Sequence, residues 1–413
     1  METIDSNDRE IIRSLAMRQM ELAKSEVNQK VINDWYKHHA FGGGRPMIHI
    51  EMGTFYNEAV APLMKCTGKT AREIESRIHM MSFNREYIGD DHPVADFFPI
   101  KVNASMQPFG LEVSRTHAQA ANTTSLGHKY THHIMDLEQD FHKLNAANIF
   151  INADDVATQM DYINEHIGDI LPAKLIGDAL YSVPTRDLVS IMDMETMYMA
   201  MYDYPELFHK MMRQLTDDYL SFFNQMEQSK LLRPVAGCDY VAQGSWGFTK
   251  ELPETGNDLR STDLWGYMDS QETVAISPAM FEEFLWPYYK EIAERIGLLS
   301  YGCCEPVHKV WYLFGTLPNL RKISISPWCD EAVMAEYLQG TNVIYHRKPE
   351  STFLGTGTNL DEEAFRAYMN VTKSLTRGLT VEITQRDIYT INNDMDKVRR
   401  YIEIIRDVFD SYI

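Results

Sequence analysis

The alternation of apolar and polar segments is most regular between residues 298 and 413. Four short runs rich in β-branched or aromatic residues, each bounded by turn formers, predict strands at 298–302, 320–326, 342–346 and 379–384. Helical stretches separate or follow them, most clearly at 361–376 and at 396–413, and in the second of these apolar residues recur at three- and four-residue steps. This order predicts parallel strands joined by helices, with the strand exits on one side.

The first half of the chain repeats the pattern more weakly. Further strands are predicted at 46–53, 96–103, 173–177 and 235–241. With the four late segments they supply the eight strands of a (β/α)8 TIM barrel. An open doubly wound sheet is the structural rival, although the chain has no GxGxxG or Walker A pattern.

Residues 1–45 are expected to form an N-terminal helical arm. Ile12, Leu15, Met20 and Leu22 fall on roughly one side of it, and the Gly42–Gly44 run closes it. Such arms pack on their own barrel or on a neighbouring subunit. The rest of the chain, 46–413, is expected to be one barrel domain.

Composition narrows the class of protein. The 413 residues are 44% hydrophobic, but no segment is long and apolar enough to cross a membrane, and the start lacks the basic and apolar regions of a secretory signal. Five cysteines, two of them adjacent, fit reduced thiols in a cytoplasmic enzyme better than a disulfide framework. The net charge of −20, without a dense Lys/Arg run, makes nucleic acid an improbable partner.

The four late strand exits collect the most reactive side chains of the chain. If the strands are parallel neighbours, these groups share one rim, which predicts an active site there. They are Cys303, Cys304, Glu305, Cys329, His346, Arg347, Lys348 and Glu382.

The segment 301–308 offers ligands for zinc. Cys303, Cys304 and His308 supply soft and borderline ligand atoms, and Cys329 at the next strand exit would complete the site. In the alternative, one thiol packs in the barrel and another contacts the substrate without a metal, since paired CxxC spacing is absent.

Charged residues at the last two strands suggest further roles. Arg347 and Lys348, with His346, would hold an anionic substrate, or they would form salt bridges to carboxylates at the rim. Glu382 lies inside a strand, where a charge needs a partner: it would pair with Arg347 or Lys348, or it would transfer protons or bind a metal.

Other candidates have weaker signals. Glu51 follows the apolar run 47–50 in the first predicted strand, Asp239 lies at the end of another, and both are candidate catalytic groups, as is Glu305. Tyr301, Trp246 and Trp328 are candidates for the substrate pocket. The segment Asp90–His92 would supply polar groups or cap a turn, and the pairs His38–His39 and His132–His133 are expected to be solvated.

Three motifs carry a resemblance to a known family. From Gly297 to the C terminus the chain resembles the uroporphyrinogen decarboxylase superfamily, and the first half does so only loosely. The segments 301–306 (YGCCEP), 325–330 (ISPWCD) and 347–349 (RKP) are similar to the branch associated with corrinoid-dependent methyl transfer. The resemblance implies a (β/α)8 barrel that is often a homodimer.

The chain departs from the family at two sites. True porphyrin decarboxylases carry Arg-Gln-Ala-Gly-Arg near the first strand, whereas this chain reads IEMGTFY at 50–56. The zinc methyltransferases use His-x-Cys at the exit that matches Tyr301 to Cys303, and a later Cys near the last strand, which here ends at Gln385. Cys303 carries over, and Cys304, Cys329 or Glu382 would have to replace the other ligands.

The resemblance implies a cytoplasmic methyltransferase that moves a methyl group between a small methylated substrate, such as an aryl methyl ether, and a corrinoid protein. Residues 90–95 echo the DxHxxG signature of corrinoid carriers, but Ala95 replaces the glycine, so the cobalamin is expected on a separate protein. The enzyme alternative is a decarboxylase of a porphyrinogen-like or smaller polycarboxylate. A tetrapyrrole-binding protein without catalysis is a third reading.

Overall fold

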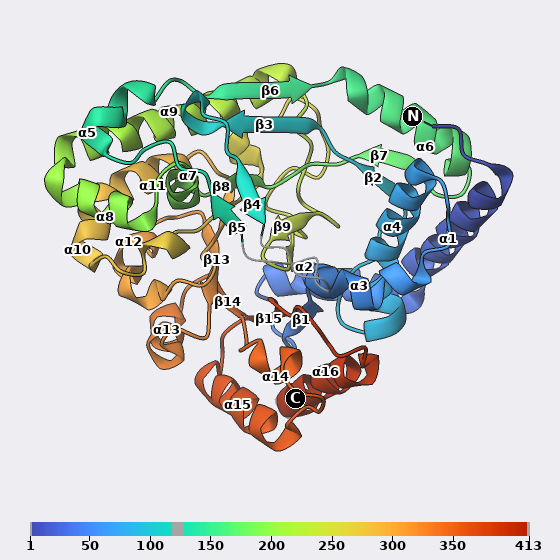
Figure 1. The fold of residues 1–413 in the computed structure, drawn as a ribbon. Coiled ribbons are helices and arrows are strands. Elements are labelled where there is room, and N and C mark those ends of the chain that lie inside the picture. The colour runs from blue at the N-terminus through green and yellow to red at the C-terminus, as the bar shows by residue number, and fades with distance from the viewer. Residues whose placement is uncertain (1, 118–127, 411–413) are drawn as a thin grey trace.

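The computed structural model describes residues 2–117 and 128–410. Its centre is a seven-stranded parallel sheet (Figure 1). The strands follow the order β1 (Met47–Ile50), β15 (Val381–Gln385), β14 (Ile344–Arg347), β13 (Leu320–Ile325), β12 (Leu298–Tyr301), β11 (Trp265–Met268) and β8 (Leu180–Ser182). The predicted α/β architecture and the four late strands are therefore confirmed.

Only five of the predicted strands belong to this sheet. The segment 96–103 contains β2 (Phe98–Ile100), which pairs with β7 (Ala173–Leu175) in a separate parallel pair. The segment 235–241 overlaps β9 (Tyr240–Ala242), which forms an antiparallel hairpin with β10 (Ser245–Trp246). The sequence did not predict β8 or β11, because β8 has only three residues and β11 (WGYM) contains a glycine and no β-branched residue.

The closed eight-stranded barrel is not detected in residues 2–117 and 128–410, because no ladder joins β1 to β8. Carboxylates cap the free edge of β1 instead. The amide of Ile48 donates to Asp91 Oδ2 at 2.9 Å, and that of Ile50 donates to Asp90 Oδ2 at 2.8 Å. The Asp90–His92 segment, predicted to supply polar groups or cap a turn, thus fills hydrogen-bonding positions that a neighbouring strand would use.

Helices surround the sheet. The long α9 (Pro205–Ser229) and the antiparallel pair β3 (Asn103–Gln107) and β6 (Asn148–Asn152) cross the top of Figure 1, and α14 to α16 cover the opposite end, near the C terminus. A second antiparallel pair joins β4 (Arg115–His117) and β5 (His128–Tyr130). The remaining helices are α3 (Tyr56–Ala59), α4 (Lys69–Phe83), α5 (Leu137–Asp140), α6 (Asp154–Ile167), α7 (Pro184–Ile191), α8 (Met194–Asp203), α10 (Pro278–Phe284), α11 (Trp286–Ala293), α12 (Trp311–Phe314), α13 (Glu331–Leu338), α14 (Thr352–Gly355), α15 (Glu362–Leu375) and α16 (Met395–Asp410).

The two helices predicted at the end of the chain are confirmed as α15 and α16. The face of α16 that contacts the core includes Val398, Tyr401 and Ile405, as the sequence period predicts. Residues 411–413 of the predicted last helix lie outside the described residues.

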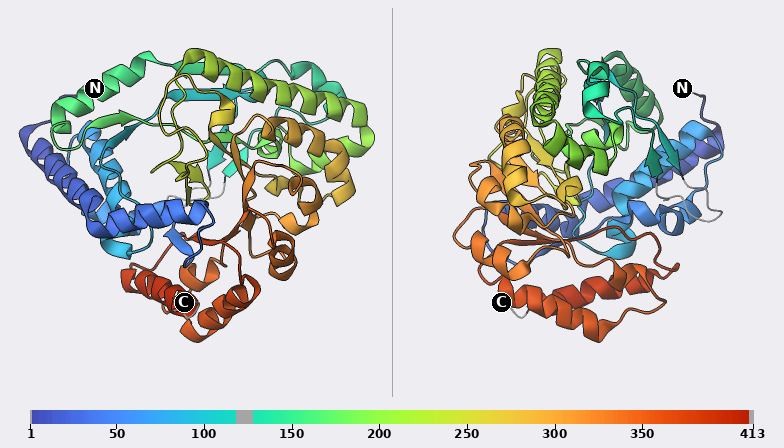
Figure 2. Two further views of the ribbon diagram at one scale, coloured as in Figure 1. Left: turned by 180° about the vertical axis from the view of Figure 1, so that it is seen from behind. Right: turned by 60° about the vertical axis from the view of Figure 1, so that its left-hand side comes forward.

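The predicted arm forms two helices, α1 (Ser6–Lys24) and α2 (Glu26–His39). Helix α1 lies beside α4, and α2 runs toward the sheet and contacts β1 (Figure 2). Ile12 and Ala16 of α1 pack with Ile74 and Ile78 of α4 in an apolar cluster apart from the main core. Helix α2 places Trp35, His38 and His39 in the interior. No helix in the described part of the chain has the length and apolar character needed to span a membrane.

Candidate functional site

Four polar side chains meet where the strands end, and we call them the rim cluster: Gln243, Cys303, Lys348 and Arg386. Cys303 Sγ lies 3.4 Å from Gln243 Oε1 and 3.6 Å from Arg386 Nη1. Lys348 Nζ donates to Gln243 Oε1 at 3.2 Å and to the carbonyl oxygen of Gly302 at 3.3 Å. The exits of β12, β14 and β15 thus share one rim, as the strand order predicts.

A strained hairpin turn places Gln243 in this cluster. Ala242, Gln243 and Gly244 have φ angles of 115°, 54° and 80°, so two residues with side chains adopt backbone conformations that L-residues rarely use. A Cβ on Gly244 would overlap Cγ2 of Thr384, so the close approach to β15 requires glycine. Strain of this kind is common at functional sites. The sequence does not predict Gln243 as a site residue, because its position depends on this turn.

The pKa values of the two adjacent thiols, Cys303 and Cys304, shift in opposite directions. Their sulfur atoms are 3.7 Å apart. The hydrogen bond to Cys304 and burial raise the pKa of Cys303, whereas the hydrogen bond from Cys303 lowers the pKa of Cys304. A thiolate therefore forms first on Cys304, while Cys303 keeps its proton.

Glu51 connects the rim cluster to a neighbouring tyrosine. It accepts hydrogen bonds from Arg386 Nε and from the hydroxyl of Tyr240. Burial alone would raise the pKa of Glu51, but the charge of Arg386 and these hydrogen bonds lower it. Glu51 is thus an ionised carboxylate that holds Arg386 beside Cys303.

Two further candidate carboxylates, Glu305 and Asp239, have raised pKa values. Glu305 is buried, accepts from the backbone amides of Ser270 and Cys303 at 2.8 Å each, and has its pKa raised by burial. It fixes the loop after β12. Burial raises the pKa of Asp239 to about 6, and its Oδ2 accepts from the amide of Gly237 at 3.1 Å.

Two cavities meet at Tyr240. One of about 600 Å³ is lined by Glu51, Trp246, several methionines and the cations Arg77 and Lys101. The other, of about 550 Å³, also borders Lys101, Ile176 and Tyr240. Both volumes suit a ligand of drug size, and the cations on their walls would attract an anion to a protein whose net charge is −20.

The predicted zinc ligands fall into two separate pairs. Cys303 and Cys304 lie in or beside the rim cluster, whereas Cys329 Sγ contacts His308 Nδ1 at 3.5 Å. The four do not form a group of three or more ligand atoms within 4.8 Å of one another; in the described part of the chain the one such group is His38, His39 and Glu382. Among the described residues, no third His, Cys, Asp or Glu ligand atom completes such a group with the two rim thiols, so the rim residues do not fit a zinc ion.

Arg347 forms the salt bridge that was the alternative to substrate binding. Its guanidinium pairs with Glu331 of α13 and contacts Tyr368 of α15, and it donates to the carbonyl oxygen of Ile325 at 3.0 Å. Successive residues of a strand face opposite ways, so Arg347 faces the helices while Lys348 faces the rim cluster. Arg347 and Lys348 are therefore not the adjacent anion-binding pair that the sequence predicted.

Glu382 and His346 lie deeper than a strand exit. The sequence predicted Arg347 or Lys348 as the partner of Glu382. The partner is instead Lys322, whose Nζ lies 3.3 Å from Oε2. His346 is buried beside it and contacts Thr384 Oγ1 at 2.8 Å. Burial lowers the pKa of His346 to about 3, so its imidazole is neutral and adds no positive charge to an anion site.

The aromatic candidates have different environments. Trp246 is buried and lines the larger cavity. Trp328 is 66% exposed. Tyr301 is buried, stacks on Phe314 with ring centres 3.6 Å apart and bonds to Ser270, and it lines neither cavity. Of the three, the structure places Trp246 alone at a cavity beside the rim.

Comparisons with known proteins place the fold. No family model and no curated protein matches this sequence. The structure is similar to that of a methyltransferase from Methanosarcina mazei, with a TM-score of 0.50 and 11% identity, over 92% of this chain and 98% of that one. A candidate vitamin-B12 independent methionine synthase from Listeria monocytogenes matches at a TM-score of 0.32 and 12% identity, over 64% of this chain and 72% of that one, and supports no argument. At 11% identity the first similarity shows the arrangement of the chain and not its activity.

Proposed function

We propose that this protein is a methyltransferase that moves a methyl group between a small methylated substrate and a corrinoid on a separate protein. The observation on which the proposal depends is the rim cluster, with Cys303 between Gln243 and Arg386 and with Lys348 bound to the same glutamine. It lies at the end of a parallel sheet where enzymes with related α/β folds hold their active sites. The whole-chain similarity to a methyltransferase fold supports the same class.

The substrate is proposed to bind in the larger cavity. Met52, Met80, Phe97 and Trp246 provide apolar walls for an aromatic ring, and Arg77 lies on the same wall. An aryl methyl ether that carries a carboxylate meets both requirements. The corrinoid is proposed to approach the rim on its carrier protein.

Lys348 is the proposed proton donor. Burial lowers the pKa of its ammonium group, which makes it a stronger acid than an exposed lysine. As the bond between the methyl group and the ether oxygen breaks, Lys348 gives its proton to that oxygen and later regains one from water. When bound, the corrinoid supplies the nucleophilic cobalt that accepts the methyl group. No step is assigned to zinc, because the rim residues do not fit it.

The test uses free cob(I)alamin and a set of aryl methyl ethers with and without a carboxylate. We expect methylcobalamin to form, faster with the carboxylated ethers, as measured by absorbance. Cys303→Ser should slow the reaction about tenfold, because the thiol contacts two members of the cluster. Cys66→Ser, at a buried thiol in the separate apolar cluster that contains α1, is the matched control and should leave the rate unchanged.

A second candidate function is decarboxylation of a polycarboxylate. It is favoured by the cations Arg77, Lys101, Lys348 and Arg386 around the cavity and rim, and by Asp239, whose pKa of about 6 suits an acid. Release of carbon dioxide from such a substrate without any corrinoid, together with no methylcobalamin from any ether, would establish this function in place of methyl transfer.

A further inference from the structure

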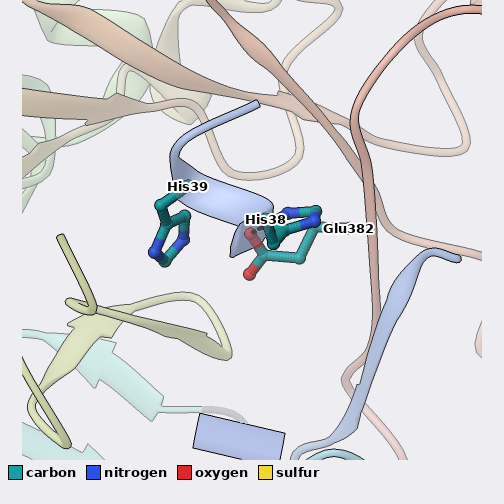
Figure 3. Close-up of side chains that lie close together, drawn as sticks. All are labelled: His38, His39 and Glu382. Atoms are coloured by element: carbon teal, nitrogen blue, oxygen red, sulfur yellow. Dashed lines mark ion pairs between the residues drawn. The ribbon is translucent and has the colours of Figure 1, made fainter. Parts of the chain in front are cut away.

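A second polar cluster lies at the opposite end of the sheet, where the strands begin, and we call it the base cluster: His38, His39, Lys322, His346 and Glu382. Figure 3 shows His38 and His39 at the end of α2, with the carboxylate of Glu382 from β15 beside them. None of these residues takes part in the proposed methyl transfer. Glu382 faces Met47, the first residue of β1, across the ladder, which fixes the cluster at the base.

The geometry of the base cluster is that of a metal site. One ligand atom from each of His38, His39 and Glu382 lies within 4.8 Å of the other two, and His38 Nε2 is 3.7 Å from Glu382 Oε2. The three residues are 5%, 1% and 0% exposed. Nε2 of both histidines and Oε1 of Glu382 have no hydrogen-bond partner, and Oε2 has the ion-pair contact with Lys322. Buried polar atoms without partners are costly, so their convergence indicates a ligand between them.

The hydrogen bond that His39 forms through Nδ1 leaves the lone pair of its imidazole on Nε2. Nδ1 of His39 contacts the carbonyl oxygen of Phe248, which can only accept, so the proton is on Nδ1. Nε2 therefore presents a lone pair to the space near Glu382. A histidine whose second nitrogen donates to a backbone carbonyl is the usual arrangement of a metal ligand.

Lys322 balances the charge of Glu382 but does not satisfy the histidines. Its Nζ lies 3.3 Å from Glu382 Oε2 and donates to Ser245 Oγ and to the carbonyl oxygen of Trp246. Those three acceptors use the three protons of the ammonium group. The lone pair of His39 stays without a donor, and Lys322 competes with a cation for one carboxylate oxygen only.

We propose that His38, His39 and Glu382 bind one divalent transition-metal ion, for which zinc is the best match to two imidazoles and a carboxylate. The ion would join the end of α2 to the last strand and so tie the N-terminal helices to the sheet. The proposal goes beyond the proposed function and does not depend on it. It also places a zinc ion away from the thiols, whereas the sequence predicted zinc at those thiols.

The test measures metal in the full-length protein after growth with zinc. We expect about one zinc ion per chain, lost on dialysis against a chelator and replaced by cobalt(II) with the visible absorption of a low-coordinate site. His39→Gln and Glu382→Gln should each weaken cobalt binding by about 10- to 100-fold. Lys322→Met should strengthen it, because the competing ammonium group is gone.

Two controls locate the ion. The double variant Cys303→Ser/Cys304→Ser should keep the zinc, and a loss of zinc there would assign the ion to the rim and overturn the proposal. The exposed-site variant His142→Gln should also keep it. If His39→Gln does not fold, the native protein and Lys322→Met decide: no zinc, no cobalt spectrum and no rise of the melting temperature with zinc in both would refute the site. Metal binding is read without any assay of methyl transfer, so either proposal can fail alone.

Discussion

The two ends of the sheet hold buried charges of different kinds. At the base, Glu382 and Lys322 are fully buried and paired with each other. At the rim, Lys348 is also buried but binds uncharged acceptors, the side chain of Gln243 and the carbonyl of Gly302. Removing one partner of a buried pair leaves the other charge uncompensated and destabilises the fold, whereas a buried charge without an ionic partner is kept at a cost and is a candidate for chemistry. The comparison assigns stability to the base and reactivity to the rim.

The same strands contribute side chains to both the base cluster and the rim cluster, because side chains alternate along a strand. On β14, His346 faces the base cluster while Lys348, two residues further on, faces the rim cluster. Arg347 between them faces outward to Glu331. His346 and Lys348 therefore face the same way but differ in their distance from the strand exit, and so they belong to different clusters.

The largest effect is expected from changing the two buried lysines. In buffer with a chelator, Lys322→Met should lower the free energy of unfolding by about 3–5 kcal/mol, because Glu382 keeps a buried charge without its counter-ion. Lys348→Met should change it by less than about 1 kcal/mol, since no carboxylate loses a salt bridge. Urea unfolding measures both. Equal losses in the two variants would remove the distinction between base and rim, and zinc added in excess of the chelator should recover the stability lost in Lys322→Met.

The hairpin turn between the two ends is the next test. Gly244→Ala should destabilise the fold by about 2–4 kcal/mol, because its φ is 80° and the new methyl group would overlap Thr384. Gly53→Ala is the matched control, since a Cβ there meets no atom within 4 Å, and should be neutral. Thermal unfolding checks the pair. An equally stable Gly244→Ala protein would show that the turn can relax.

The change at Lys348, which should affect stability little, should affect activity strongly. Lys348→Met should lower kcat/KM for methylcobalamin formation about 100-fold, because the proposed proton donor is lost. Lys290→Met, at a lysine paired with Glu294 on the surface, should leave it unchanged. A Lys348→Met enzyme with full activity would exclude lysine as the donor.

The smallest effect concerns Asp239, which has a buried carboxyl group. Its folded pKa of about 6 exceeds its usual value of 3.8, so the folded state binds its proton more tightly. This group therefore lowers stability as the pH rises from about 4 to 6. Asp239→Asn should raise the free energy of unfolding by about 1–2 kcal/mol at pH 7 and leave it unchanged at pH 4. Unfolding curves at the two pH values check this, and a gain of equal size at both would rule out the titration.

Part of this protein could be predicted from residue patterns alone. The runs that became β12 to β15 are long enough to show their character, and the strand order then put Cys303 and Lys348 at one rim. The charge at Glu382, inside an apolar strand, was a valid sign that a partner must exist. Lys322 could have been recognised as that partner in the same way, because it too is a charged residue inside a buried strand. The cytoplasmic location, the homodimer and the corrinoid partner stay predictions.

Contacts between distant segments decided the rest. The sequence predicted solvated histidines at positions 38 and 39, but they are buried, because α2 packs at the base of the sheet against residues more than 200 positions away. Gln243 reached the rim through a strained turn, and Asp90 and Asp91 replaced a strand at the edge of β1. Local pattern determines which segments become strands and helices, since it reflects backbone geometry and the burial of one face. Which charges then meet depends on long-range packing, and only the folded chain settles that.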